Sequence, residues 1–262
     1  MDKEHSRPSS EDAARRLLIL RHVAASVVIA PVLEISDQWS AEEREKFQHS
    51  SEAQYRQFWQ GLRDVGLWPH LSPLEKAHAS CTILTMTEQQ VINATWRIEA
   101  AQMLAWALGM LPQLPPYDTR VSFDFLEHIP TDGLNAFIGS ARLRDESEID
   151  AARATAEFWH WRSRTRELIE RGEAFPDEED LRTAGLRCYD DVVRISASNG
   201  VQEGLIPKCI DGDFPAKGKA YRDMSDEEWS EVTSITVERH FALNWLCGYA
   251  PGNRWDETPT DT

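Results

Sequence analysis

Apolar residues recur along most of the chain at spacings of three and four residues, and Gly or Pro interrupts this pattern at intervals. The periodicity is typical of amphipathic helices, and Gly or Pro commonly follows the last helical turn. We therefore predict helices over eight ranges: 10–30, 40–65, 73–86, 88–109, 131–143, 146–171, 178–198 and 226–247. Neither an internal repeat nor the strand–helix alternation of a nucleotide-binding sheet is visible. The pattern predicts a mainly α fold: a single multi-helix domain of about eight helices over residues 1–262.

Four of the predicted helices begin with the same signal. Ser40, Ser72, Thr87 and Ser225 are each followed, three residues later, by Glu or Gln. In such a capping box the first side chain accepts a hydrogen bond from the backbone three residues on, and the later side chain accepts one in return. The spacing predicts that a helix begins at each of these four positions.

Two segments and the C-terminal tail lack helical periodicity. Residues 111–130 contain four prolines and could hold one short strand, at 120–125. Residues 201–224 carry several Gly and Pro, which predicts a long loop, either ordered or flexible. Because Trp255 offers a large apolar surface, we expect the tail Trp255–Thr262 to be ordered and folded back onto the helices.

The composition narrows the class of protein. Among 262 residues, 44 are acidic and 28 basic, so the formal net charge is −16, which disfavours binding to nucleic acid. No apolar run reaches the ~20 residues that a membrane span requires, and the charged first residues lack the apolar core of a signal peptide. The four cysteines are too widely spaced for a zinc site, and we expect buried free thiols. We therefore predict a soluble, cytoplasmic protein.

Two charged residues fall within predicted apolar helix faces. Glu99 lies in the apolar stripe of 88–109, and Arg239 lies in that of 226–247. A buried charge is very costly without a partner, and we expect Arg239 to pair with Glu99 or Asp256. The same reasoning predicts a structural ion network that joins two helices and the tail, made of Arg97, Glu99, Glu238, Arg239 and Asp256.

An alternative interpretation of these residues is catalytic. Glu99, Glu238, His240 and Asp256 are candidates for general acid–base chemistry, because a carboxylate can bring the pKa of a nearby His close to neutral pH. The enzyme would then be a hydrolase or oxidoreductase, with or without a metal.

Two Glu-x-x-His pairs are weak candidates for metal ligands. They are Glu75 with His78 and Glu157 with His160, a pattern found in di-iron helical bundles. Glu75 also belongs to a capping box, and short motifs of this kind arise by chance. No glycine-rich phosphate loop and no nucleophile elbow is present, and we expect no cofactor and no metal.

Several stretches resemble a known family. Trp96–Ala100 leads into Leu104–Gly109, Glu238–Trp245 reads Glu-Arg-His-x-Ala-Leu-Asn-Trp, and the chain ends in Trp-Asp-Glu-Thr-Pro-Thr-Asp-Thr. These motifs are similar to those of the bacterial domain-of-unknown-function family 4272, over nearly the whole chain. The family tends to have an Asp-x-x-Tyr-Arg-x-x-Trp pattern in its long middle helix, where this chain has Ala154 and Phe158 at the Asp and Arg positions. The resemblance implies a fold and an extent rather than an activity.

Acidic side chains are concentrated in the last third of the chain. Residues 173–262 hold 19 acidic and 9 basic residues. Such a face could simply aid solubility, or it could dock a basic protein. The candidate partner-binding residues are Asp177, Glu178, Glu179, Asp180, Asp226 and Glu227.

Taken with the lack of a recognisable catalytic motif, this acidity favours a non-enzymatic protein-binding module. Its most plausible form is an immunity-protein or antitoxin-like neutraliser of a basic toxin or effector. The alternatives are the enzyme built on Glu99, Glu238 and His240, and a purely structural protein. The sequence leaves the oligomeric state open.

Overall fold

The computed structural model describes residues 6–29, 40–81 and 85–261. The α-helices in these ranges are α1 Ser10–Ile29, α2 Ala41–Asp64, α3 Pro73–Ser80, α4 Glu88–Ala107, α5 Leu134–Ser140, α6 Glu146–Glu170, α7 Glu179–Thr183, α8 Tyr189–Gln202 and α9 Asp226–Leu246. Short 3₁₀ turns are η1 Trp68–His70, η2 Phe123–His128, η3 Tyr221–Asp223, η4 Pro251–Asn253 and η5 Trp255–Glu257. Strands β1 Pro215–Ala216 and β2 Lys219–Ala220 pair antiparallel. The predicted mainly α fold is confirmed.

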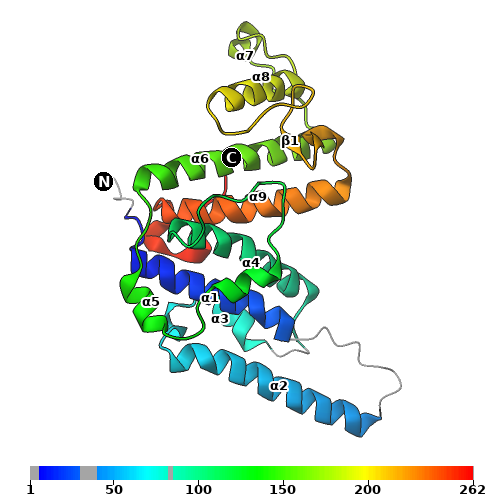
Figure 1. Cartoon of the computed structure of the whole chain (residues 1–262). Helices are drawn as coiled ribbons and strands as arrows, with labels where there is room; N and C mark the ends of the chain where they lie inside the picture. Colours follow the sequence, from blue (N-terminus) through cyan, green and yellow to red (C-terminus); the bar gives the residue numbers. More distant parts are fainter. Residues whose placement is uncertain (1–5, 30–39, 82–84, 262) are drawn as a thin grey trace.

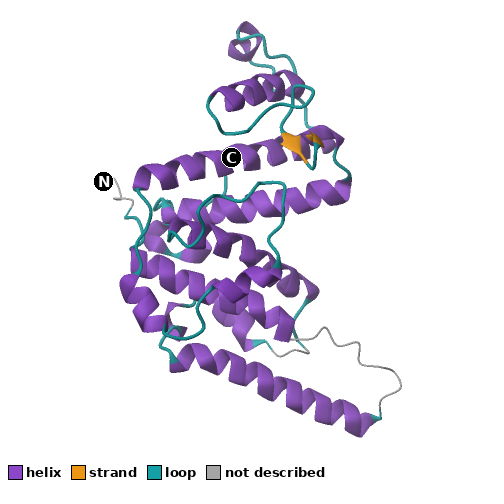
Figure 2. Ribbon diagram, in the orientation of Figure 1, coloured by secondary structure: helices purple, strands orange, loops and turns teal. Residues whose placement is uncertain are grey.

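The helices α1, α4, α9 and α6 form a stack at the centre of the molecule (Figure 1). Helix α4 packs between α1 and α9, and α9 packs in turn on α6. Several apolar residues of α4 are fully buried at this junction, among them Ile98, Ala101 and Leu104. Helix α2 lies at one end of the stack, and α7 and α8 stand apart beyond α6 at the other end (Figure 2).

The four capping boxes are all present. Ser40, Ser72, Thr87 and Ser225 each accept a hydrogen bond from the N–H three residues on, and the Glu or Gln there accepts one from the capping residue's N–H. Local hydrogen bonding therefore places the starts of α2, α3, α4 and α9 where the sequence predicts them.

The predicted helix 178–198 is instead two helices. Gly185 lies between α7 and α8 with a φ of 80°, in the left-handed region that favours glycine, and it ends α7. Helix α8 then continues through Gly200, which the pattern suggested as a stop. Gly200 lies against the Phe158 ring of α6, where a Cβ would come within 2.4 Å of a ring carbon. This glycine permits close packing of two helices rather than ending one.

Two loop predictions also change. The strand at 120–125 is wrong: Val121 gives its N–H to the Glu99 carboxylate, and Ser122 caps the 3₁₀ turn η2. Residues 201–224 form the β1–β2 hairpin and its flanks, in which Phe214 and Tyr221 are fully buried. The second segment is therefore ordered by burial of its aromatic side chains.

The C-terminal tail folds onto the helices. Trp255 is 2% exposed, and its ring meets those of Phe241 and Trp245 edge-on at centroid distances of 4.7 and 5.3 Å. Asn244 donates a hydrogen bond to the carbonyl of Pro259. Thr262, and residues 30 and 82–84 of two predicted helices, lie outside the described residues.

The thiols differ from one another in exposure. All four cysteines are free, but Cys247 alone is buried, whereas Cys188 is exposed. The expected burial therefore holds only for Cys247. Among the described residues, no helix combines the length and the apolar character needed to cross a bilayer.

Candidate functional site

A fully buried ion pair joins α4 to α9. Glu99 and Arg239 are both 0% exposed, and the Arg239 Nη2 and Nε atoms lie 2.8 and 3.0 Å from Glu99 Oε2. Each charge lies on the face that its helix buries, because the two apolar stripes pack against each other with this pair between them. The attraction across a dry interface compensates for the cost of removing both charges from water.

The remaining polar atoms of this pair hold the segment 115–121. Arg239 donates to the carbonyls of Pro115, Pro116 and Thr119 at distances of 2.8–3.1 Å. Glu99 Oε1 accepts the N–H of Val121 at 2.8 Å. The guanidinium fork and the carboxylate are thus used in holding a proline-rich loop to two helices, which is a structural role.

A second pair lies beside the first. Arg97 Nη1 is 3.0 Å from Glu238 Oε2 and 3.2 Å from Oε1, at a half-buried position. Burial raises the pKa of the Glu238 carboxyl, Arg97 opposes that shift, and the nearby charge of Glu99 adds to it. Four of the five predicted network residues therefore meet at the α4–α9 interface.

Asp256 does not join that network. Its Oδ2 atom accepts the N–H of Leu74 at 2.8 Å, in the first turn of α3. The first N–H groups of a helix have no partner within the helix, and the helix dipole attracts a carboxylate there. Because the tail runs past this helix end, Asp256 joins the tail to α3, and the predicted contact with Arg239 is absent.

His240 is also separate from the two glutamates. Its Nδ1 atom lies 3.0 Å from Nδ1 of His160 on α6, and the two rings meet edge-on. Successive helical residues are about 100° apart, and so His240 lies on the opposite side of α9 from Glu238. The predicted cluster of Glu99, Glu238 and His240 is not assembled.

The histidine pair is held in its neutral form. Burial, together with the adjacent His160, lowers the pKa of His240 to about 3. Burial also lowers the pKa of His160. At the Nδ1···Nδ1 contact one ring must donate and the other must accept, which requires at least one neutral imidazole.

The two Glu-x-x-His pairs lie in different parts of the molecule. Glu75 of α3 binds Arg16 with both oxygens at 2.6–2.7 Å, and His78 Nε2 lies 2.9 Å from the Ser26 hydroxyl. Glu157 of α6 pairs with Arg153 at 3.1 Å. Within the described ranges no three His, Cys, Asp or Glu side chains are placed to hold a metal ion. The predicted four-ligand arrangement does not form, because α3 and α6 lie on opposite sides of the stack (Figure 1).

Besides Arg16–Glu75, sequence reasoning missed a second buried ion pair. Arg162 of α6 binds Asp213 with two 2.7 Å hydrogen bonds, and their side chains are 2% and 0% exposed. Although burial acts to raise it, the hydrogen bonds from Arg162 lower the pKa of Asp213. The position of Arg162 on the buried face of α6 could have indicated a buried partner. Asp213 could not be found in the same way, because its segment has no helical periodicity.

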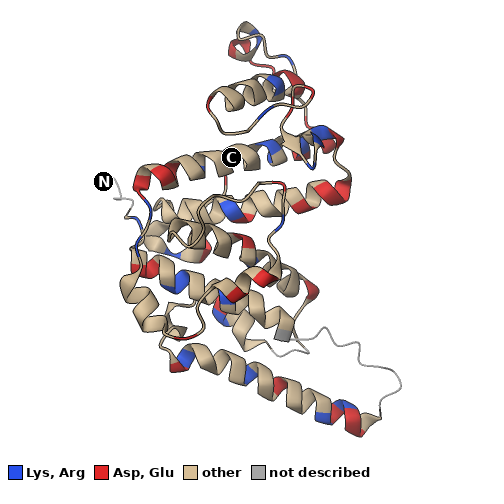
Figure 3. Cartoon of the chain, viewed as in Figure 1, with Lys and Arg blue, Asp and Glu red and all other residues tan. Residues whose placement is uncertain are grey.

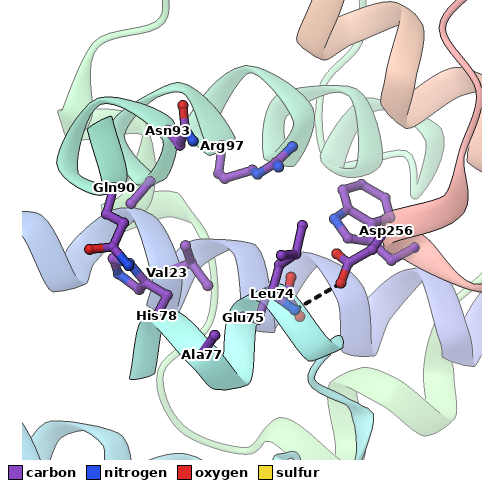
Figure 4. Close-up of a pocket in the computed structure, with 11 residues that line it drawn as sticks. Val23, Leu74, Glu75, Ala77, His78, Gln90, Asn93, Arg97 and Asp256 are labelled. Carbon is purple, nitrogen blue, oxygen red and sulfur yellow. Dashed lines mark hydrogen bonds between the residues drawn. The ribbon is translucent and has the colours of Figure 1, made fainter. Parts of the chain in front are cut away.

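A small pocket brings together residues that the sequence analysis named as metal-ligand, ion-network and catalytic candidates. It has a volume of about 170 Å³ and lies between α3, α4 and the tail (Figure 4). Glu75 and His78 line it from α3, Arg97 from α4 and Asp256 from η5. Only the tertiary packing places these residues around one space.

The sequence model described as "Domain of unknown function (DUF4272)" matches residues 2–189. The protein is a member of the DUF4272 family. The match contains Trp96–Gly109, which carries part of the resemblance, and it ends before the α9 and tail motifs. No curated protein and no solved structure matches the chain.

This DUF4272 protein carries an exposed acidic segment that follows α6 and runs into the first turn of α8, which we name the acidic arm (residues 173–192). The arm has seven acidic and two basic residues, and none of its side chains is buried. It includes the candidates Asp177, Glu178, Glu179 and Asp180, all exposed. Acidic positions are marked in red on the ribbon around α7 in Figure 3.

The other two partner-binding candidates lie on the bundle itself. Asp226 and Glu227 are exposed in the first turn of α9. Asp226 lies 3.8 Å from Arg166, and both residues add negative charge to a helix N-terminus.

Proposed function

We propose that this protein is a non-enzymatic binding module whose acidic arm docks on a basic surface of a partner protein. The carrying observation is the exposure of the arm: twenty consecutive residues, including helix α7, bury no side chain. A segment without a core of its own gains little from folding alone. Its apolar residues, such as Phe175 and Leu181, are only half-buried within the chain and could be covered further by a partner.

Charge complementarity supports a basic partner. Asp177 pairs with Arg182 and Asp191 with Arg194. In the part of the chain that the structure describes, Glu178, Glu179 and Asp180 form no ion pair. Three adjacent, uncompensated carboxylates create a local negative potential that speeds encounter with a positive surface.

The internal contacts of the catalytic candidates also favour binding over catalysis. Glu99 is enclosed by Arg239 and the Val121 N–H, Glu238 by Arg97, and Asp256 by the start of α3. Each carboxylate already has a structural partner, and His240 lies on another helix face. The arm is therefore the better supported site.

Cross-linking in the native cells tests the proposal. Mass spectrometry of the cross-linked peptides should join residues 173–192 to a protein of high isoelectric point. A variant with three arm substitutions, Glu178→Gln, Glu179→Gln and Asp180→Asn, should bind the purified partner roughly tenfold more weakly.

A matched variant controls for net charge. It neutralises three exposed acidic residues outside the arm, Glu45→Gln, Glu127→Gln and Asp132→Asn, and should bind like the wild type. Cross-links that fall only outside the arm, or equal weakening by both variants, would contradict the proposal.

The specific form that we propose is a cytoplasmic neutraliser of a basic toxin or effector. Acidity and the exposed arm support it, since an inhibitor must cover a positively charged surface. Expression of the cross-linked partner in cells that lack this protein should arrest growth. The wild type should restore growth, and the arm variant should restore it less well. A partner that is harmless when expressed alone contradicts this form and leaves the docking proposal intact.

A further inference from the structure

The pocket beside the tail has both apolar and polar walls. Val23 of α1, Ala77 of α3 and Ala94 of α4 contribute aliphatic surface. Leu74 is 63% exposed and lines the same space, and Asn93 is exposed as well (Figure 4). The pocket is therefore open to solvent and can admit a small molecule without a change in the fold.

One wall has a buried donor without a partner. Trp255 is 2% exposed and lines the pocket, and its indole Nε1–H makes no hydrogen bond. Buried polar groups are nearly always paired, and an unpaired donor is a place where a ligand acceptor is favoured. Arg97 lies in the same pocket and uses its Nη1 atom for Glu238. Its other guanidinium nitrogens make no hydrogen bond within the described residues, so they are available to a ligand acceptor.

The pocket also offers a negative charge, the carboxylate of Asp256. Asp256 Oδ2 accepts from Leu74, whereas Asp256 forms no ion pair with any described residue. Glu75 pairs with Arg16, and Arg97 with Glu238, whereas Asp256 is satisfied by a backbone N–H and has no ion-pair partner among the described residues. A positive group of a ligand is favoured beside it.

We propose that this pocket binds a free α-amino acid with an aliphatic side chain. The ligand carboxylate would accept from the Trp255 indole and from Arg97, and its ammonium group would lie against Asp256. The aliphatic side chain would contact Val23, Ala77 and Leu74.

The size of the pocket supports this class. A volume of about 170 Å³ suits a small molecule such as a single amino acid. This inference is independent of the acidic arm, because the arm contributes no residue to the pocket.

NMR of the ¹⁵N-labelled full-length protein tests the inference with L-leucine as the probe. Trp255→Phe keeps an aromatic ring but removes the unpartnered N–H together with part of the buried ring volume. It identifies the Trp255 indole resonance by its disappearance. That resonance should shift on titration with L-leucine. The Phe variant should bind roughly tenfold more weakly, by calorimetry.

Two analogues and a matched variant make the outcome decisive. L-leucinamide lacks the carboxylate and isocaproate lacks the ammonium, and each should bind roughly tenfold more weakly than L-leucine. Trp229→Phe removes another unpartnered indole N–H outside the pocket and should leave binding unchanged. The inference is wrong if L-leucine moves no indole resonance or moves that of another Trp. It is equally wrong if either analogue binds as well as L-leucine.

Discussion

Arg239 is the side chain on which the polar contacts of the core converge. It binds Glu99 and three backbone carbonyls from inside a fully buried environment. A residue of this kind acts on the fold through its partners: if it is removed, a carboxylate and a loop both lose their compensation.

Arg239→Ala should therefore destabilise the protein by about 3–5 kcal/mol, because it leaves Glu99 buried and unpaired. Urea unfolding at neutral pH measures this change. Glu227→Gln, at an exposed position, should change the free energy of unfolding by no more than about 0.5 kcal/mol. An Arg239→Ala midpoint equal to that of the wild type would show that the pair is not structural.

The buried histidines make stability depend on pH. The pKa of His240 is about 3 in the folded protein, below its ordinary value of 6.5. The unfolded chain therefore binds more protons, and stability falls as the pH decreases from the unfolded value toward the folded one. This histidine alone should cost about 2 kcal/mol between about pH 7 and pH 5.

His240→Gln tests that contribution. The variant should lose about 2 kcal/mol less than the wild type over the same pH interval, whatever its stability at neutral pH. Denaturant unfolding at the two pH values provides the comparison. His49→Gln, at an exposed position, should retain the wild-type dependence. Identical slopes for His240→Gln and the wild type would contradict the assignment.

At the scale of elements, the contact between α6 and α8 depends on a missing side chain. Val193, Ala197 and Gly200 are the buried residues of α8, at positions i, i+4 and i+7 on one face. Gly200 lies against Phe158 of α6. Small residues on this face let the two helices approach closely.

Gly200→Ala should destabilise the protein by about 1–3 kcal/mol, because the new Cβ overlaps the Phe158 ring. Gly61→Ala is the matched control: Gly61 lies within α2, with no atom within 4 Å of an added Cβ. That change should stabilise the protein by about 0.5–1 kcal/mol through higher helix propensity. Urea unfolding of both variants separates packing from propensity, and equal effects of the two changes would refute the steric explanation.

At the scale of the whole molecule, stability is unevenly distributed. The stack of α1, α4, α9 and α6 contains most of the core, whereas the acidic arm buries no side chain. Local opening is easiest where few apolar contacts form. The arm can therefore open while the bundle stays folded.

Limited proteolysis should detect this difference. Trypsin should make its first internal cuts after Arg182 and Arg187, both exposed in the arm. The two fragments should stay together in size-exclusion chromatography, since α6 packs on α9 across the cut. Mass spectrometry identifies the sites, and first cuts within α4 or α9 would contradict this distribution of stability.

The sequence by itself determined the features that depend on near neighbours in the chain. Capping boxes place the starts of α2, α3, α4 and α9, because both partners of each box lie within one helical turn. The stripes of α4 and α9 also required that Glu99 and Arg239 be compensated, since an isolated buried charge is too costly. The mainly α class followed from the spacing of apolar residues, which is also a property of near neighbours in the chain.

Only the tertiary structure decided which distant residues meet. The tail passes the start of α3, and so Asp256 binds Leu74 instead of Arg239. The orientation of α9 in the bundle places His240 next to His160. Gly200 lies against Phe158, and α8 continues through this glycine instead of ending at it. The pocket at Arg97 and Trp255 depends on four chain segments at once. Local hydrogen bonding and periodicity are read from neighbouring residues, whereas these contacts depend on how whole helices pack, which no local pattern encodes.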